Sequence, residues 1–563
     1  MGAIILNGNT YHLRGNVQPY PVEQYGQAII TGSPARANET KLRKLIFNQW
    51  YKWGIGWHTG DPLTGRAIGG AARDATVDTR FPILTNSILH EAQTHASPAD
   101  HIQAYVNFKG NFYGFFEEDY VGGSPTVMTP LMRVWNAGTD TWDAAATIIT
   151  ENELSDNERG GRVFDAIVHK SAIFVLTNNI DLGSGEDQPD GPMSYVMRIS
   201  TDASSFADTA GTHASFAYRL IPRAVYRRNT PSDDYGRLLD IGNTLMVAMF
   251  EDSNAIHSSI NQIRILYTVD SGANWVAGAI IPSGYGPKAF VRWRDPYSSP
   301  VGADIPVLVT AEGLYRVDAD GTTFDLIYAL DGNVNNGRWT AVGQDGGLII
   351  GLGSGGRVVL YINPSGGVEV RGSGDPGDGL VAARRGHVNY VLTPSLPWYF
   401  LAYGGHASGE QASIFAVDYK WQTDPVTGKL FQAWHSMYLE ANANIDLYVL
   451  GYSSADDSTP RLHFALEHAS SAEMYHLEQP IDNELQSGVT HKRAVTSFIE
   501  FPEENGGDPH TPKNILRARV DAEDLSGTDA GEYIENEYGI NKADWTNVSN
   551  LGYFVSGDKE LLL

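Results

Sequence analysis

Cysteine is absent from this chain of 563 residues. Its absence excludes disulfide bonds, catalysis by a thiolate and zinc sites built on cysteine. The sequence also lacks any uninterrupted run of about 18 apolar residues, so no membrane-spanning helix is expected. It contains no phosphate-binding loop, no dinucleotide-binding glycine fingerprint after a strand, and no convincing nucleophile elbow. Thiol enzymes, helical membrane proteins and the common nucleotide-binding folds are therefore removed from consideration.

Basic residues are also scarce, with 40 Lys and Arg against 66 Asp and Glu, for a formal net charge of −26. Such a chain repels nucleic acids and anionic membrane surfaces. We therefore expect no nucleic-acid partner and no membrane insertion. The residues from Met1 to Gly8 lack the basic and apolar regions of a signal peptide, so synthesis in a cytoplasm is expected.

Glycine and aromatic residues are abundant: the chain has 60 Gly, 28 Tyr, 20 Phe and 12 Trp. This composition favours strands joined by tight turns. Between residues 101 and 480, short strand patterns alternate with turn clusters, and no convincing helical period intervenes. The strands fall into six or seven groups, which predicts an all-β fold with a β-propeller of about 6–7 blades. A pair of β-sandwiches or a β-helix remains the alternative.

Three regions are expected. Residues 1–100 are predicted to be an N-terminal β docking segment, 101–480 the propeller, and 495–563 a small C-terminal β-sandwich-like module. Large apolar side chains at both ends are candidates for contacts with other chains, or with a continuation of this one beyond its last residue. They are Trp50, Trp53 and Trp57 near the start, and Leu561, Leu562 and Leu563 at the end.

One turn carries a recognisable motif, formed by Thr268, Asp270, Gly272 and Trp275. The Asp is expected to accept hydrogen bonds from the turn, the Gly to allow a positive φ, and the Trp to cover the hairpin. The pattern resembles the Asp box of sialidase-like propellers. That resemblance implies a fold and a structural role, because Asp boxes lie on blade corners away from the active site. Looser versions occur at residues 133–142, 198–206, 315–324 and 359–367.

The sequence also contains residues that were considered as candidates for catalysis or metal binding. The segment from Tyr218 to Arg223 resembles the Arg-Ile-Pro strand of sialidases with one residue inserted, and a set of polar residues at 292–297 could supply further groups. That set is Arg292, Arg294, Asp295 and Tyr297. Paired carboxylates at 117–119 are of the kind that glycosidases use. The structural interpretation is favoured for each, so no catalytic residue and no metal ligand are assigned. Acidic glycine loops such as Asp318–Asp325 make Ca²⁺ the one cofactor considered.

The whole chain resembles virion structural proteins of tailed phages in its composition and expected layout. This resemblance implies a non-enzymatic, tail-associated component of the virion, made in the host cytoplasm. Its partners would be other virion proteins, copies of itself, and a glycan or receptor on the host surface. Two alternatives remain open. One is a sialidase-like or other glycoside hydrolase acting on host surface glycans, and the other is a bacterial glycan-binding adhesin.

Overall fold

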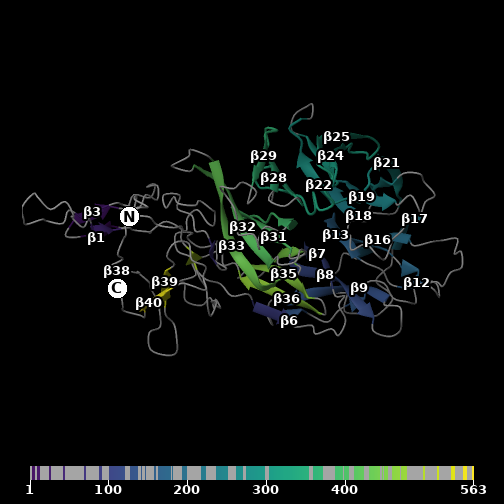
Figure 1. The fold of residues 1–563 in the computed structure, drawn as a ribbon. Helices are drawn as coiled ribbons and strands as arrows, with labels where there is room; N and C mark the ends of the chain where they lie inside the picture. The colour runs from purple at the N-terminus through teal and green to yellow at the C-terminus, as the bar shows by residue number, and fades with distance from the viewer. Residues whose placement is uncertain are drawn as a thin grey trace, which may run out of the picture. The chain divides into compact units, whose positions relative to one another are not determined.

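The computed structural model describes strands β1 to β41. It also describes the following residues outside these strands: 109–110, 170–171, 242–243, 261, 269–270, 274–275, 283–288, 295–297, 303, 310–312, 318–323, 330–340, 343–347, 352–353, 363–367, 387, 393–396, 404, 445, 447, 449 and 460. Every regular element among these residues is a β-strand (Figure 1). No helix in this described part is long and apolar enough to cross a membrane.

Seven antiparallel sheets of four or five strands dominate the described residues. The first contains β7 (His101–Phe108), β8 (Asn111–Tyr120), β9 (Val127–Asn136), β10 (Thr141–Trp142) and β11 (Ala146–Thr147). The second contains β13 (Val163–His169), β14 (Ala172–Asn178), β16 (Met193–Ile199) and β17 (Ala217–Pro222). The third contains β18 (Gly236–Ile241), β19 (Thr244–Glu251), β20 (Gln262–Thr268) and β21 (Val276–Pro282).

The remaining large sheets continue in chain order. The fourth contains β22 (Ala289–Arg294), β23 (Asp304–Val309), β24 (Gly313–Val317) and β25 (Phe324–Ala329). The fifth contains β26 (Ala341–Val342), β27 (Leu348–Gly351), β28 (Val359–Ile362) and β29 (Val368–Arg371). The sixth contains β30 (Val388–Leu392), β31 (Trp398–Tyr403), β32 (Gln411–Thr423) and β33 (Leu430–Ala443). The seventh contains β34 (Leu450–Ser453), β35 (Arg461–His468), β36 (Ser471–Glu478) and β6 (Ile88–Glu91).

Six pairs of short strands complete the described structure. They are β1 (Ala3–Leu6) with β2 (Asn9–His12), β3 (Gln24–Gly26) with β4 (Leu42–Lys44), β5 (Gly69–Gly70) with β37 (Ile499–Glu500), β12 (Glu158–Arg159) with β15 (Ile180–Asp181), β38 (Arg517–Ala518) with β41 (Leu561–Leu562), and β39 (Ile534–Tyr538) with β40 (Ser549–Phe554). The chain divides into two compact units, and all seven large sheets belong to the first. That unit comprises Met1–Pro19, Asn48–His58 and Thr64–Glu500; the second comprises Tyr20–Phe47, Thr59–Leu63 and Phe501–Leu563.

Each large sheet packs its faces against its neighbours in the chain. Strand β31 illustrates the cause, because its side chains alternate between two sides. Tyr399, Leu401 and Tyr403 join an apolar core shared with the fifth sheet, while Phe400 and Ala402 join a core shared with the seventh. A strand covered on both faces is therefore a continuous apolar run, as the sequence of β31 is.

Seven apolar cores arise in this way, each shared by two sheets. Six join sheets that follow one another along the chain. The seventh joins the last sheet to the first: Val449 and Met474 pack with Phe112, Trp135 and Trp142. β34 likewise contacts β7.

The contact between the last and first sheets is close. The Asn107 side-chain amide donates a 2.7 Å hydrogen bond to the Tyr452 carbonyl oxygen, across 345 positions of sequence. Gly451 faces the Tyr105 ring so closely that an added Cβ would lie 2.5 Å from it. Strand β6, from the N-terminal segment, supplies the outer strand of the same last sheet by pairing with β36.

Parts of the sequence-based expectations fall outside the described residues, including Trp50, Trp53, Trp57, Gly272 and Leu563. Leu561 and Leu562 form β41, whose backbone pairs with Ala518 and Arg517 of the same chain. The role of the chain ends in contacts with other chains stays a prediction.

Candidate functional site

Arg237, the second residue of β18, is a buried cation that joins three sheets. It is only 2% exposed. Its Nε donates to the carbonyl oxygen of Lys288 at 3.0 Å, and its Nη1 donates to those of Phe164 at 3.1 Å and Gly236 at 2.8 Å. Phe164 belongs to the second sheet, and Lys288 directly precedes the fourth. The guanidinium group is therefore fixed by backbone carbonyls of neighbouring sheets.

Asp165 on β13 makes the reciprocal link. Its Oδ2 accepts a hydrogen bond of 2.8 Å from the backbone N–H of Leu238 on β18, and its Oδ1 accepts one of 2.9 Å from Ala166. Burial raises the pKa of Asp165 to about 6, although the Arg237 charge and both N–H groups act in the opposite direction. The side chain is nevertheless partly exposed. A carboxyl group that is half protonated near pH 6 can donate a proton or accept one.

Aromatic side chains from other sheets interact with Arg237 and Asp165. The Trp339 ring lies with its centroid 4.2 Å from Cζ of Arg237 and 4.9 Å from the Tyr390 centroid. Burial, and then the charge of Asp165, raises the pKa of the Tyr390 phenol. Burial, and then Tyr390, raises that of Tyr105. Trp339, Tyr390 and Tyr105 are all partly exposed.

We call these five residues the acid–aromatic cluster: Tyr105, Asp165, Arg237, Trp339 and Tyr390. Four lie on the first strands of different sheets, and Trp339 lies just before β26, the first strand of the fifth. The cluster could not be predicted from the sequence, because its members stand about 50–100 positions apart and form no local motif. The one available signal was their common place at the start of successive strand groups.

The Asp-box turn joins β20 to β21. The Asp270 carboxylate accepts hydrogen bonds from the Thr268 hydroxyl at 2.7 Å, the Asn274 backbone N–H at 2.9 Å and the Asn274 side-chain amide at 2.6 Å. These bonds, that of the Asn274 backbone first, lower the pKa of Asp270 to about 2. Trp275 is half-buried and packs against the core shared by the second and third sheets. The hydrogen bonds of Asp270 therefore lie within one hairpin, and the Trp275 ring packs on the apolar core beside it.

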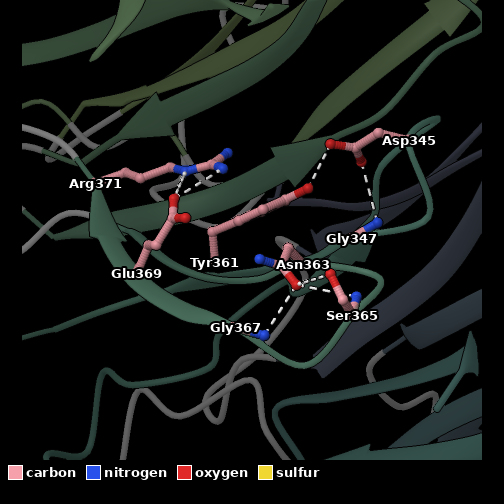
Figure 2. Close-up of polar contacts among 8 residues, drawn as sticks. All are labelled: Asp345, Gly347, Tyr361, Asn363, Ser365, Gly367, Glu369 and Arg371. Atoms are coloured by element: carbon pink, nitrogen blue, oxygen red, sulfur yellow. Dashed lines mark hydrogen bonds and ion pairs between the residues drawn. The ribbon is translucent and has the colours of Figure 1, made fainter. Parts of the chain in front are cut away.

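Two further sheets carry a similar fastening in the same place, the turn between their third and fourth strands. In the fourth sheet, the Asp320 carboxylate accepts hydrogen bonds from the N–H and the hydroxyl of Thr322. In the fifth, the Asn363 side-chain oxygen accepts them from the N–H and hydroxyl of Ser365 and from the N–H of Gly367 (Figure 2). The looser sequence echoes at 315–324 and 359–367 thus mark equivalent corners.

Figure 2 shows a second polar cluster, within the fifth sheet. The Asp345 carboxylate accepts hydrogen bonds from Gly347 N–H at 3.0 Å and from the Tyr361 hydroxyl at 2.5 Å. Cζ of Arg371 lies 3.3 Å from the Tyr361 ring centroid, and its guanidinium also pairs with Glu369 at 3.2 Å. Burial, followed by the bond to Asp345, raises the pKa of the Tyr361 phenol. The hydrogen bonds and the ion pair of these groups lie within one sheet, which is typical of a structural network.

The residues considered for sialidase chemistry do not converge with the acid–aromatic cluster through any described contact. Asp295 is buried and accepts hydrogen bonds from Tyr297 N–H at 2.7 Å and from Arg316 at 3.0 Å. Arg292 forms an exposed ion pair with Asp304. Side chains at 117–119 and 218–223 lie outside the described set. Among the described residues, no group of three or more His, Asp or Glu side chains is arranged to hold a metal ion.

No protein-family model and no curated protein matches this chain. Solved structures match it at low identity. Trypanosoma rangeli sialidase in complex with sialic acid is 12% identical, with a TM-score of 0.36 over 73% of this chain and 59% of the sialidase. The WD40 domain of Neurospora crassa Pan2 is 11% identical, with a TM-score of 0.38 over 72% and 96%. The polysaccharide lyase Uly1 is 10% identical, with a TM-score of 0.37 over 74% and 100%. No activity follows from similarity at this level.

Proposed function

We propose that the seven large sheets close into a seven-bladed propeller and that the acid–aromatic cluster is its carbohydrate site. Closure is supported by the core between the last and first sheets, the contact of β34 with β7, and the hydrogen bond from Asn107 to Tyr452. Strand β6 in the last sheet would fasten the ring, because it ties the N-terminal part of the chain to the C-terminal strands.

The observation that carries a carbohydrate function is the position of Asp165 beside partly exposed aromatic groups. A carboxyl group with a pKa of about 6 is suited to donate a proton to the oxygen of a breaking glycosidic bond. The rings of Trp339, Tyr390 and Tyr105 offer flat apolar faces and phenol hydroxyls, which suit the C–H faces and hydroxyl groups of a sugar. Hence Asp165 is the candidate general acid.

Whether a second catalytic group accompanies Asp165 distinguishes a catalytic function from glycan binding alone. Most glycoside hydrolases use two carboxyl groups, and the described cluster contains one. In a catalytic version, the second proton-active group would come from outside the described cluster, because burial and then the charge of Asp165 raise the pKa of the Tyr390 phenol and keep it protonated. In a non-catalytic version, the cluster binds a glycan without cleaving it, as an adhesin would. We place the catalytic version first because burial has tuned the carboxyl group toward neutral pH.

The test is product analysis with a panel of polysaccharides, covering neutral glucans and xylans, uronate polymers and sialylated glycans. New reducing ends would report hydrolysis, while products that absorb ultraviolet light through a new double bond would report elimination. Asp165→Asn should lower turnover at least 100-fold. Asp325→Asn is the matched control, since its carboxylate is exposed and pairs only with Arg316. Binding without turnover would favour the adhesin, and neither binding nor turnover would reject the proposal.

The expectation of a phage virion component rests on composition and layout, and it stays a prediction. A propeller that binds host glycans could be part of such a particle, and it could equally be a secreted enzyme. Detection of the chain in purified virions, in several copies, is the observation that would establish that location.

A further inference from the structure

Trp339 has an unusual backbone. Its φ is 53°, in the left-handed region that bulky residues rarely adopt. Two other described non-glycine residues have positive φ, Lys109 and Lys170, and each lies in a two-residue hairpin turn where this conformation is usual. Trp339 instead stands at the approach to β26, between Gly337, which is also left-handed, and Thr340. The Thr340 hydroxyl donates to the Gly337 carbonyl at 2.9 Å and holds this segment in place.

Core packing does not account for this strained conformation. Trp339 belongs to none of the seven apolar cores, although it is one of the largest side chains in the sheets. Its ring contacts are instead with the Arg237 guanidinium and the Tyr390 ring, at 4.2 Å and 4.9 Å. Backbone strain that persists at a polar site is a reason to look for a role there.

We infer that Trp339 is a positioning residue for the acid site, since its left-handed backbone sets the indole against the Arg237 guanidinium and the Tyr390 ring. Arg237 directly precedes Leu238, whose backbone N–H donates to the Asp165 carboxyl group. This inference rests on the proposed function, which supplies the role of Asp165. The indole is attracted to the cation through its π face and to the phenol ring by stacking. It keeps both groups in place and limits the access of water to them.

The ionisation of Asp165 should report this role. Among the described residues, the charged or titratable groups that interact electrostatically with its carboxyl group are Arg237 from β18 and Tyr390 from β30, and Tyr390 interacts in turn with Tyr105 from β7. Burial is the largest cause of the raised pKa. Removing the indole admits water to this group of side chains. The pKa of Asp165 then falls toward 3.8, the value of an ordinary Asp.

Trp339→Gly in the full chain is the test, because glycine adopts the left-handed backbone without strain while the ring is lost. Infrared difference spectra recorded against pH measure the protonated carboxyl band, and subtraction of the Asp165→Asn spectrum assigns it. We expect the pKa of Asp165 to fall by at least one unit in Trp339→Gly. Lys109→Gly, at another left-handed position, should leave it unchanged. Trp339→Phe should restore most of the wild-type value, since it keeps an aromatic ring.

An unchanged pKa of Asp165 in Trp339→Gly overturns the inference. If Trp339→Gly does not fold, Trp339→Asn replaces it, because asparagine tolerates the left-handed backbone and lacks the ring. An unchanged pKa of Asp165 in that variant overturns the inference in the same way. The infrared measurement does not depend on turnover. A shift in a protein that neither binds nor cleaves any glycan would reject the proposed function and leave the positioning role standing.

Discussion

The hydroxyl group of Tyr297 donates a hydrogen bond of 2.6 Å to the carbonyl oxygen of Gly366. Tyr297 follows the first strand of the fourth sheet, and Gly366 lies in the turn between the third and fourth strands of the fifth. Equivalent turns accept a hydrogen bond from the preceding sheet at two further places: Lys170 Nζ to Val269 O, and Ala279 N to Gly321 O. The turn at Asp270 and its echoes therefore hold the third, fourth and fifth sheets each to the one before it.

Substitution at Gly366 should separate this contact from backbone strain. An added Cβ would lie 2.7 Å from the Tyr297 ring, at a φ of 88°. Gly346 has a φ of 80°, but its nearest contact would be 3.6 Å away. We expect Gly346→Ala to cost about 1 kcal/mol through strain alone and Gly366→Ala about 2–4 kcal/mol through strain and crowding. Urea unfolding measures both, and equal losses would show that the contact with Tyr297 contributes nothing.

Closure between the last and first sheets makes a second prediction. Gly451→Ala should destabilise the protein by about 1–3 kcal/mol, because the new methyl group would overlap the Tyr105 ring. Gly284→Ala is the control, since its Cβ would meet only the flexible carboxylate of Glu312 at 3.2 Å. Denaturant midpoints measure the difference. A Gly451→Ala protein as stable as Gly284→Ala would argue against a closed ring.

The contribution of the turn at Asp270 to the stability of the protein should depend on pH. The pKa of Asp270 is lowered to about 2 in the folded protein, below the value near 3.9 of an unfolded chain. Its contribution to stability is therefore complete above about pH 4 and is lost as the pH falls through 2. Asp270→Asn should be less stable than wild type at pH 6 and nearly equal to it at pH 2. Melting temperatures at both pH values provide the comparison, and a constant difference would contradict the account.

The contribution of Asp165 to stability should have the opposite pH dependence. Its pKa is raised to about 6 in the folded protein, so folding is favoured most below pH 4, and this contribution disappears as the pH rises through 6. Two pKa units correspond to about 2–3 kcal/mol. Asp165→Asn should therefore gain stability over wild type between pH 4 and 7. Chemical unfolding at several pH values tests this, and parallel pH profiles for the two proteins would refute the raised pKa.

Much of the fold could be predicted from local patterns. The short strands expected between residues 101 and 480 correspond to the strands from β7 to β36, and the hairpin expected around Asp270 corresponds to β20 and β21. Alternating burial within short strands and polar glycine turns are local signals, so a single sequence carries them. The participation of β6 in the last sheet could not be predicted, since its pairing with β36 joins residues almost 400 positions apart.

The candidate site was less accessible to prediction for a similar reason. Asp165, Arg237 and Tyr390 are brought together by the packing of separate sheets, and each is unremarkable among its sequence neighbours. The polar runs that did attract attention, such as Arg292 to Tyr297, serve links within and between sheets. Sequence patterns locate corners and strands well, while a site assembled from several sheets becomes visible only in three dimensions.

The pH dependence of kcat/KM on the best glycan substrate tests the central claim most directly. A general acid works in its protonated form, so activity should fall as the pH rises above about 6, with a single ionisation that is absent from the residual activity of Asp165→Asn. Activity that stays constant from pH 5 to 8, or full activity in Asp165→Asn, would contradict the assignment of Asp165 as the acid of a carbohydrate site.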